Sequence, residues 1–442
     1  MVICYLEVFM YQLKTPSFKE LRQYLDDIPI IESHEHYTNY AEEKDVLKFL
    51  FSNFYYYSDF ISAGGDEEET DGPSTAERFR RFLQIYKKSD KTSYARCMAE
   101  GLRQCWGIES LDSIEDSGKL EAMLKKRDSG IYEKTMERLK IRAKVVDIYE
   151  LPDFMSYVEG EKKTQSKYCR FAFPLPPFHN VHNKADFLQY RKYLDRTIVS
   201  LDDYLESFDN FLEKCVKFGV VCMKDQSAYR RSIAYGNPGR NEAEKIFNEI
   251  NFNPRDIFGD EKVRPLDDWL FQYAMRKAAE YKLPVQIHTG HMAGIRNEIA
   301  KTNAALLIPT IELNEDVRFD LFHGNWPYMD EYLFMGKNYP NVYLNLCWVQ
   351  SIDPVYCVEL MKRAVMTVPH SKVFAFGGDT GVVEWVAGYL SLAKDNVAIA
   401  LSELVDSLWL SMNEAKQISI DWFYNNPNNF YGLALEDGEI PK

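Results

Sequence analysis

Four of the eight histidines stand at the ends of short apolar runs, where their imidazoles could bind a metal ion. His34 and His36 follow the apolar segment 28–32 and are two residues apart. Residues i and i+2 of an extended chain point to the same side, so both rings would project to one place. His288 lies in PVQIHTG and His323 in FDLFHGN, each directly after an apolar run. Imidazole is a common ligand of Zn²⁺ and similar divalent ions.

A carboxylate and an amine occupy equivalent positions in two further runs. Asp379 ends VFAFGGD and Lys224 ends VVCMK. With a carboxylate added to the imidazoles, we predict a divalent metal site. A buried lysine is costly unless it is paired or modified. Lys224 could be carboxylated and bridge two metals, bind one metal as an uncharged ligand, or hold an anionic substrate. An ordinary salt bridge to Asp225 or Asp379 is the simpler alternative.

Five residues near these positions are candidates for substrate contact. Tyr229, Arg230 and Arg231 stand in SAYRRS, shortly after Lys224. An arginine there could bind a substrate carboxylate through two hydrogen bonds, although surface ion pairing is as common a role. His291, in HTGHM, could contact substrate, and Trp326, in HGNWPY, could form a pocket wall or pack in the core.

The elements that must position these side chains alternate along the chain. Eight apolar, β-branched or aromatic runs predict buried parallel strands, at residues 28–32, 144–149, 170–175, 220–224, 284–288, 318–323, 341–346 and 372–377. Between most of them, apolar residues recur at helical spacing, as in 201–218 and 266–281. This alternation predicts an α/β protein with a (β/α)8 TIM barrel. In such a barrel the carboxyl ends of the strands surround one pocket, so the candidate ligands would converge there.

The spacing of the strands is uneven and suggests three parts. Residues 1–40 would hold an N-terminal segment and the first strand, and residues 41–140 a helical insertion. Residues 141–442 would hold the rest of the barrel and its closing C-terminal helices. The aromatic run FSNFYYYSDF, residues 51–60, could line the substrate pocket or form the core of the insertion. The acidic loop 64–72 is expected to be a solvated turn.

Composition excludes several classes of protein. The 442 residues have a net charge of −14, which argues against nucleic-acid or anionic-membrane partners. We find no apolar stretch of about 18 residues that could span a membrane. The apolar N-terminal segment lacks the features of a signal peptide, and the eight cysteines contain no C-x-x-C pair. We therefore expect reduced thiols, a cytoplasmic location, a small-molecule substrate and a homo-oligomer. P-loop, dinucleotide-binding and nucleophile-elbow motifs are absent.

The ordered set of candidate ligands resembles that of the amidohydrolase superfamily. The likeness is closest to its amidohydrolase 2 branch, which includes uronate isomerase-like and decarboxylase-like members. The segments KDQSAYRR, IHTG, FHGNWPY and NPNNFYGL resemble the same branch. The resemblance spans roughly residues 25 to 435 apart from the insertion, and it is specific for the superfamily but weak for any substrate.

The resemblance implies roles for the individual residues. His34, His36, His288 and Asp379 would bind one or two divalent ions, with Zn²⁺ the first expectation. Asp379 would also take the proton from metal-bound water. His323 would bind a second metal in two-metal members of the family, or polarise substrate and shuttle protons in one-metal members. A carboxylated lysine at position 224 would favour two metals.

Three functions follow as hypotheses. The first is a metal-dependent hydrolase in which activated water attacks an amide, ester or lactone of a small, acidic substrate. The second keeps the metal site but acts as a uronate isomerase-like enzyme or a decarboxylase-like lyase on a small carboxylate. The third is a barrel that binds a metal or ligand without catalysis.

Overall fold

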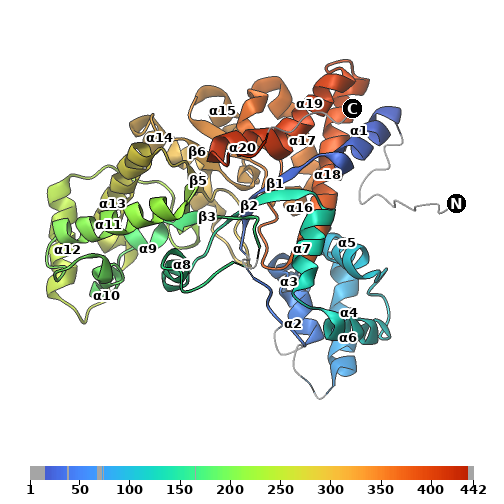
Figure 1. Ribbon diagram of the computed structural model, residues 1–442, viewed down its shortest axis with the longest axis horizontal. Coiled ribbons are helices and arrows are strands. Elements are labelled where there is room, and N and C mark those ends of the chain that lie inside the picture. Colours follow the sequence, from blue (N-terminus) through green and yellow to red (C-terminus); the bar gives the residue numbers. More distant parts are fainter. Residues whose placement is uncertain (1–14, 37–38, 67–71, 73, 165, 437–442) are drawn as a thin grey trace.

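The computed structural model of this chain describes residues 15–36, 39–66, 72, 74–164 and 166–436. Eight parallel strands follow one another around a nearly closed barrel with helices between them, and the predicted (β/α)8 fold is confirmed (Figure 1). The strands are β1 Ile30–Glu35, β2 Ile141–Val146, β3 Cys169–Pro174, β4 Cys222–Asp225, β5 Val285–Ile287, β6 Phe319–Leu321, β7 Val342–Asn345 and β8 Val373–Phe374. The expected strand ranges differ from these by a few residues at each end.

Backbone contacts bring the last strand beside the first. The Ser33 amide donates to the Phe376 carbonyl at 3.0 Å, and the Asp379 amide donates to the His34 carbonyl at 3.2 Å. The segment after β8 therefore runs next to β1. This closure carries Asp379 to the histidines, although more than 300 residues separate them in sequence.

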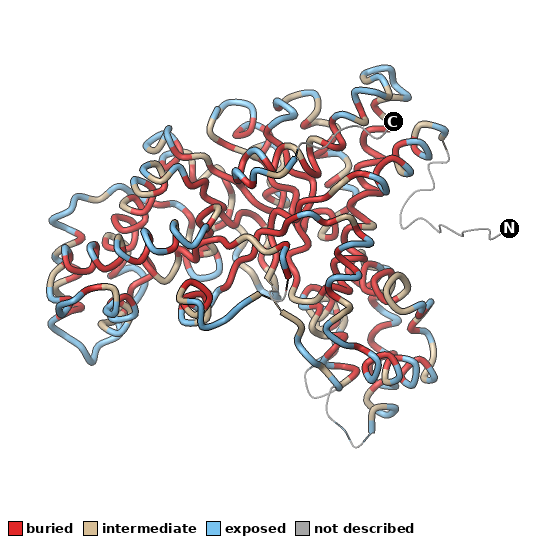
Figure 2. Tube along the Cα trace, viewed as in Figure 1, coloured by how far each residue is buried: buried red, intermediate tan, exposed pale blue. Residues whose placement is uncertain are grey.

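Helices cover the outside of the barrel, and the figures show them around a buried centre (Figures 1 and 2). Helix α11 illustrates how they are delimited. It begins at a Ser200–Asp203 capping box and ends at Gly219, whose φ of 101° suits a residue without Cβ. The helices outside the insertion are α1 Pro16–Asp27, α8 Leu151–Val158, α9 Pro176–His179, α10 Lys184–Leu188, α11 Leu201–Phe218, α12 Arg240–Phe252, α13 Asp260–Tyr281, α14 Ile308–Leu313, α15 Met329–Asn338, α16 Val349–Ile352, α17 Pro354–Thr367, α18 Val383–Asp406, α19 Met412–Ile420 and α20 Asn426–Tyr431.

Between β1 and β2 the chain forms further helices, which gather in a lobe at one side of the barrel in Figure 1. They are α2 Val46–Phe51, α3 Phe54–Ser62, α4 Thr75–Ser89, α5 Ser93–Trp106, α6 Asp116–Lys126 and α7 Gly130–Arg138. Helix α5 packs closely on α18, because a Cβ on Gly388 would lie 1.9 Å from the Cys97 carbonyl oxygen. The buried Arg127 guanidinium also donates to Glu384 of α18 at 2.7 Å. These contacts hold the lobe against the barrel.

The C-terminal motif NPNNFYGL has a structural role in the barrel. The Asn426 side-chain amide donates to the Val373 carbonyl at 2.9 Å, at the start of β8. The Tyr431 hydroxyl donates to the buried Asp320 carboxylate on β6 and accepts from the Gln286 amide on β5 at 2.9 Å. Helix α20 therefore supplies polar partners to the inward-facing side chains of the strands.

Two observations bear on the expected surroundings of the chain. Among the described residues, no helix has the length and apolarity needed to cross a bilayer. The cysteines in the described part of the chain are free thiols.

Candidate metal centre

Three of the predicted ligands meet at the carboxyl end of the barrel. His34 and His36 stand at the end of β1 and just after it, and Asp379 lies in the loop after β8. The Nε2 atoms of His34 and His36 lie 3.1 and 2.9 Å from the same oxygen, Oδ1 of Asp379. Potential ligand atoms of these three residues all lie within 4.8 Å of one another. This separation allows one ion to contact all three.

Backbone carbonyls set the tautomers of two imidazoles. A carbonyl oxygen can only accept, so Nδ1 of His36 must donate to the Asp147 carbonyl, at 3.1 Å. For the same reason Nδ1 of His323 donates to the Cys347 carbonyl, at 3.1 Å. When these imidazoles are neutral, each Nε2 carries a lone pair. Such outer hydrogen bonds are the usual way in which a protein orients a metal-binding histidine.

The remaining pair, His288 and His323, supports the presence of a cation most directly. Nε2 of His288 donates to the His291 carbonyl at 2.7 Å, which leaves a lone pair on Nδ1. That Nδ1 lies 3.2 Å from Nε2 of His323, which is also a lone-pair nitrogen. Two lone pairs at this distance repel unless a proton or another cation lies close to them. Burial lowers the pKa of His288 to about 3 and the pKa of His323 well below its usual value, which disfavours a proton. The donor set therefore fits a metal ion.

The charge of Asp379 completes this arrangement. Burial alone would raise the pKa of its carboxyl group, but His34 and His36 outweigh burial and hold that pKa well below 3.8. Its second oxygen, Oδ2, lies 3.8 Å from Nε2 of His323. Burial, reinforced by the positive charge of Lys224, lowers the pKa of His34. The pKa of His36 is raised instead, because Asp379 and Asp147 outweigh its burial. The site thus combines imidazoles with one ionised carboxylate, a composition that suits a divalent ion.

Lys224 lies near these residues but forms none of the expected salt bridges. It is buried on β4, and its Nζ lies 3.5 Å from the centroid of the Phe322 ring. Among the described residues, Nζ has no hydrogen-bond partner, and it makes no ion pair with Asp225 or Asp379. Burial lowers its pKa despite the opposing influence of Asp147 and Asp379. A lysine with a lowered pKa has a larger uncharged fraction, which is the form that reacts with CO₂ or binds a metal.

The backbone at Asp379 is strained and held by two groups that the sequence did not single out. Asp379 has a φ of 53°, in the left-handed region. The Tyr55 hydroxyl donates to the Asp379 carbonyl at 2.5 Å, and the Thr380 amide donates to Glu35 at 3.0 Å. A Cβ on the neighbouring Gly378 would lie 2.0 Å from the Glu35 carboxylate, so the loop needs glycine there.

Tyr55 belongs to the aromatic run 51–60, whose role was open between a substrate pocket and the core of the insertion. Tyr56 and Phe60 pack against Phe82 of α4, inside the insertion. Tyr55 instead stacks on Trp348, with ring centroids 4.2 Å apart, and reaches the Asp379 loop. None of the run lines the cavity described below. The run therefore forms insertion core, with one residue at the metal centre.

Tyr149 is a further residue that sequence reasoning missed. It stands shortly after β2, its ring stacks on His36 with centroids 4.3 Å apart, and its hydroxyl donates to Nε2 of His36 at 2.6 Å. The signal was available, because Tyr149 ends the expected strand 144–149 as the other candidates end theirs.

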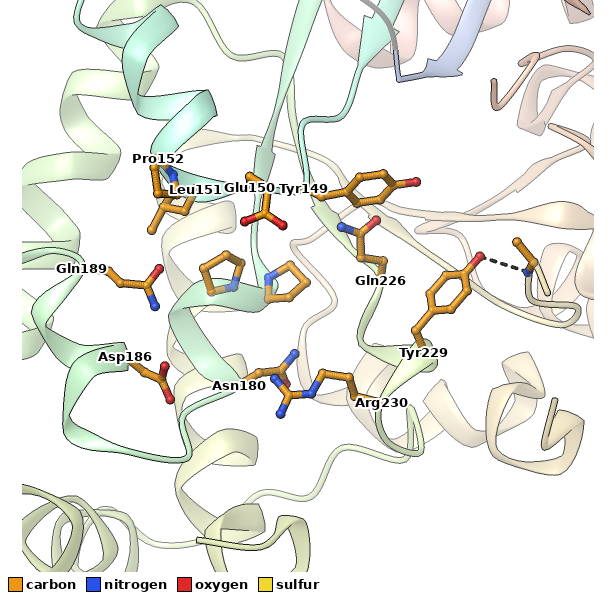
Figure 3. A pocket seen from close by; sticks show the side chains of 13 residues that line it. Tyr149, Glu150, Leu151, Pro152, Asn180, Asp186, Gln189, Gln226, Tyr229 and Arg230 are labelled. Atoms are coloured by element: carbon orange, nitrogen blue, oxygen red, sulfur yellow. Dashed lines mark hydrogen bonds between the residues drawn. The ribbon is translucent and has the colours of Figure 1, made fainter. Parts of the chain in front are cut away.

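A cavity of about 560 Å³ opens beside this centre, within the usual size of small-molecule sites (Figure 3). Loops after β2, β3, β4 and β5 supply its walls: Tyr149, Glu150, Leu151, Pro152, Pro176, Pro177, Asn180, Asp186, Gln189, Gln226, Tyr229, Arg230 and Ala293. Two predicted substrate residues, Tyr229 and Arg230, are among them. A smaller adjoining cavity includes His36 and shares Tyr149 and Glu150 with the first.

The other predicted substrate residues lie elsewhere. Arg231 is buried and pairs with Asp268, so it does not line the cavity. His291 and Trp326 contact each other, with ring centroids 5.4 Å apart, and His291 also lies 5.1 Å from the Trp348 ring. They form an aromatic group next to His323, which Trp348 contacts at 5.0 Å. The structure thus separates Arg231 from its neighbour Arg230.

Comparison with known families agrees with this site. The family model described as amidohydrolase matches residues 242–380, a range that includes His288, His323 and Asp379. Over this range, which is less than half of the chain, the sequence is similar to the amidohydrolase family. The match and the barrel fold together support an amidohydrolase-type TIM barrel. The family resemblance predicted from the sequence is therefore confirmed.

Individual relatives are distant. A uronate isomerase from Thermotoga maritima superposes with a TM-score of 0.77 at 12% identity, covering 94% of this chain and 97% of that one. A Lactobacillus casei ATCC 334 protein, provisionally described as a metal-dependent hydrolase, superposes with a TM-score of 0.65 at 13% identity, covering 93% and 97%. At such identities the likeness shows the fold alone.

One curated relative is similar in sequence. Protein fluG of Emericella nidulans is 26% identical over 178 residues. These residues are 38% of this chain and 20% of the relative, so the chain matches about a fifth of that longer protein.

Proposed function

We propose that this chain is a metal-dependent hydrolase that acts on an amide, ester or lactone of a small, acidic substrate. The observation that supports it best is the meeting of imidazole nitrogens with the ionised Asp379 at the mouth of the barrel. His34, His36 and His288 would hold the ion together with Asp379, and Lys224 would join them if it is carboxylated. We propose Zn²⁺ because the donor set is rich in nitrogen.

A divalent ion bound there would supply Lewis acidity and make water more acidic. The chain's own residues would do the rest. Oδ1 of Asp379 faces His34 and His36, which leaves Oδ2 to take a proton from the attacking water and return it to the leaving group. Nδ1 of His323 is held by the Cys347 carbonyl, so its Nε2 keeps a lone pair that faces His288 and Asp379. Trp348 and Phe322 pack beside this ring and limit access of bulk water.

A second candidate is isomerisation or decarboxylation of a small carboxylate. The likeness to a uronate isomerase over nearly the whole of both chains favours it. Asp379 could then move a proton between adjacent carbons, with the Tyr149 hydroxyl 2.6 Å from His36 as a neighbouring proton donor.

Metal dependence and reaction type can be tested together. Protein stripped with a chelator would be reloaded with Zn²⁺, Mn²⁺ or Fe²⁺, and its metal content would be measured. It would then be assayed for acid release from lactones and amides, ketose formation from hexuronates, and CO₂ release from aromatic acids. We expect metal-dependent acid release that falls at least a thousandfold in His36→Ala and Asp379→Asn. The exposed His370 offers a matched control, since His370→Ala removes an imidazole outside the site.

Each contrary result has a definite meaning. Full activity in protein shown to be free of metal would refute metal dependence. Turnover of hexuronates or aromatic acids alone would replace hydrolysis with the second candidate. Unchanged biological activity in both site variants would favour a barrel without catalysis. The cytoplasmic location, the homo-oligomeric state and the three-part division of the chain stay predictions.

A further inference from the structure

The cavity beside the metal centre contains two charged side chains of opposite sign that are not paired with each other. Arg230 lies in the loop after β4, and Glu150 lies just before α8. Figure 3 shows the guanidinium and the carboxylate on opposite sides of the cavity. Among the residues that the structure describes, neither side chain forms an ion pair or a hydrogen bond. A ligand is therefore free to use both charges.

Asp186, the third charged residue of the cavity, already accepts hydrogen bonds from the protein backbone. The Asp186 carboxylate accepts hydrogen bonds from the backbone amides of His182 and Asn183, at 2.8 and 3.1 Å. It completes the capping box that starts helix α10. Its role is structural, which leaves one cation and one anion for recognition.

The wall near Arg230 is rigid. The Asn180 side-chain amide donates to the Ser227 hydroxyl at 3.0 Å, and that hydroxyl donates to the buried Asp225 carboxylate at 2.6 Å. The Tyr235 hydroxyl donates to the other oxygen of Asp225 at 2.5 Å, and His179 contacts the same group. This buried network fixes the turn that precedes Arg230. A site on a rigid turn loses less conformational entropy when it binds a ligand.

Two tyrosines connect the cavity with the metal centre. Tyr149 lines the cavity and contacts His36, and Tyr229 lines it and lies 4.9 Å from the His288 ring. The Tyr229 hydroxyl is held by the Ala293 amide at 3.1 Å. A molecule that fills the cavity can therefore place one part near the histidines and another part between Arg230 and Glu150.

We propose that this cavity binds the α-ammonium and α-carboxylate groups of an amino acid whose side chain carries the reacting carbonyl group. Arg230 binds the carboxylate through two parallel hydrogen bonds, and Glu150 binds the ammonium group. The amides of Gln226 and Gln189 offer further donors and acceptors. A uronate would use the charge of Arg230 alone, and a neutral sugar would use neither charge. The inference rests on the proposed function and adds a substrate class to it.

The test measures binding rather than turnover, so it does not depend on the reaction catalysed. Dissociation constants of metal-loaded, full-length protein would be measured by calorimetry for L-glutamine, its α-amide, N-acetyl-L-glutamine and D-glucuronate. The same ligands would be titrated into Arg230→Gln and Glu150→Gln. Arg191→Gln and Glu161→Gln are matched controls, because both residues are exposed and lie outside the cavity.

We expect each charge to act on its own ligand group. Arg230→Gln should weaken the binding of L-glutamine about tenfold and leave the affinity for the α-amide unchanged. Glu150→Gln should weaken the binding of L-glutamine about tenfold and leave the affinity for the N-acetyl derivative unchanged. Neither control should alter binding.

Other results would overturn the inference. These are failure of L-glutamine to bind, equal effects of all four variants, or tighter binding of D-glucuronate that depends on Arg230 alone. Binding as expected without hydrolysis would remove the proposed hydrolase function and leave this inference standing.

Discussion

Replacing Tyr55 with phenylalanine should weaken metal binding while leaving the fold intact. The Tyr55 hydroxyl is the link between the helical insertion and Asp379, whose carbonyl it binds at 2.5 Å. The variant keeps the ring that stacks on Trp348 at 4.2 Å and removes one buried hydrogen bond. Any loss of metal affinity would then report on the orientation of Asp379, since Tyr55 is a positioning residue and not a ligand.

The expected magnitude follows from the strain at Asp379. A carbonyl left without its partner in a buried setting costs about 1–3 kcal/mol. The left-handed backbone at this residue, with φ of 53°, itself costs about 1–2 kcal/mol and must be held by its neighbours. If about 1.4 kcal/mol of this free-energy cost opposes the orientation of Asp379 that binds the metal, the metal affinity falls about tenfold. This agrees with the usual effect of removing an outer-shell partner.

The affinity would be measured by competition with a chromophoric chelator, and stability by urea unfolding of the metal-free protein. Tyr56→Phe is a close control, because the adjacent hydroxyl is also buried but contacts Ser89 at 3.4 Å, inside the insertion. We expect only Tyr55→Phe to weaken metal binding. Equal metal affinities in the two variants would refute the claim that the insertion orients Asp379.

Two further predictions concern stability. Arg127→Met should destabilise the fold by about 3–5 kcal/mol, because it leaves the fully buried Glu384 without its charge partner. A loss of stability below about 1 kcal/mol in urea unfolding would contradict the role of this ion pair. Burial lowers the pKa of Lys372 to about 8, below the 10.5 of the unfolded chain, so the folded state disfavours its charge below pH 8. The stability of the wild type relative to Lys372→Met should therefore rise from pH 8 to 10.5, and a flat difference would show that the pKa is not lowered.

Much of the barrel could be predicted from local pattern. Apolar runs of four to six residues separated by helical periodicity specify buried parallel strands, and eight such units specify a closed barrel. The same rule explains why His34, His288 and Asp379 could be assigned to one site. His34 lies at the end of a strand and the other two follow one, and the strand ends of a barrel share one rim.

Local sequence pattern does not predict the different surroundings that adjacent side chains reach. Arg230 and Arg231 are equivalent in sequence, but the turn after β4 sends one into the cavity and the other to Asp268. Tyr55 and Tyr56 differ in the same way, one reaching Asp379 and the other the insertion core. A single residue step in a helix or turn changes the direction of a side chain by about 100°, which composition does not record.

The sequence by itself determined which chemical groups are available and, through periodicity, at which end of the barrel they stand. Only the tertiary structure decided what surrounds them. Burial lowers the pKa values of three imidazoles, those of His34, His288 and His323. Backbone carbonyls set the tautomers of His36 and His323, and distant segments supply Tyr55 and Tyr149. These properties depend on contacts between residues far apart in the chain, and the sequence around one partner does not specify the other.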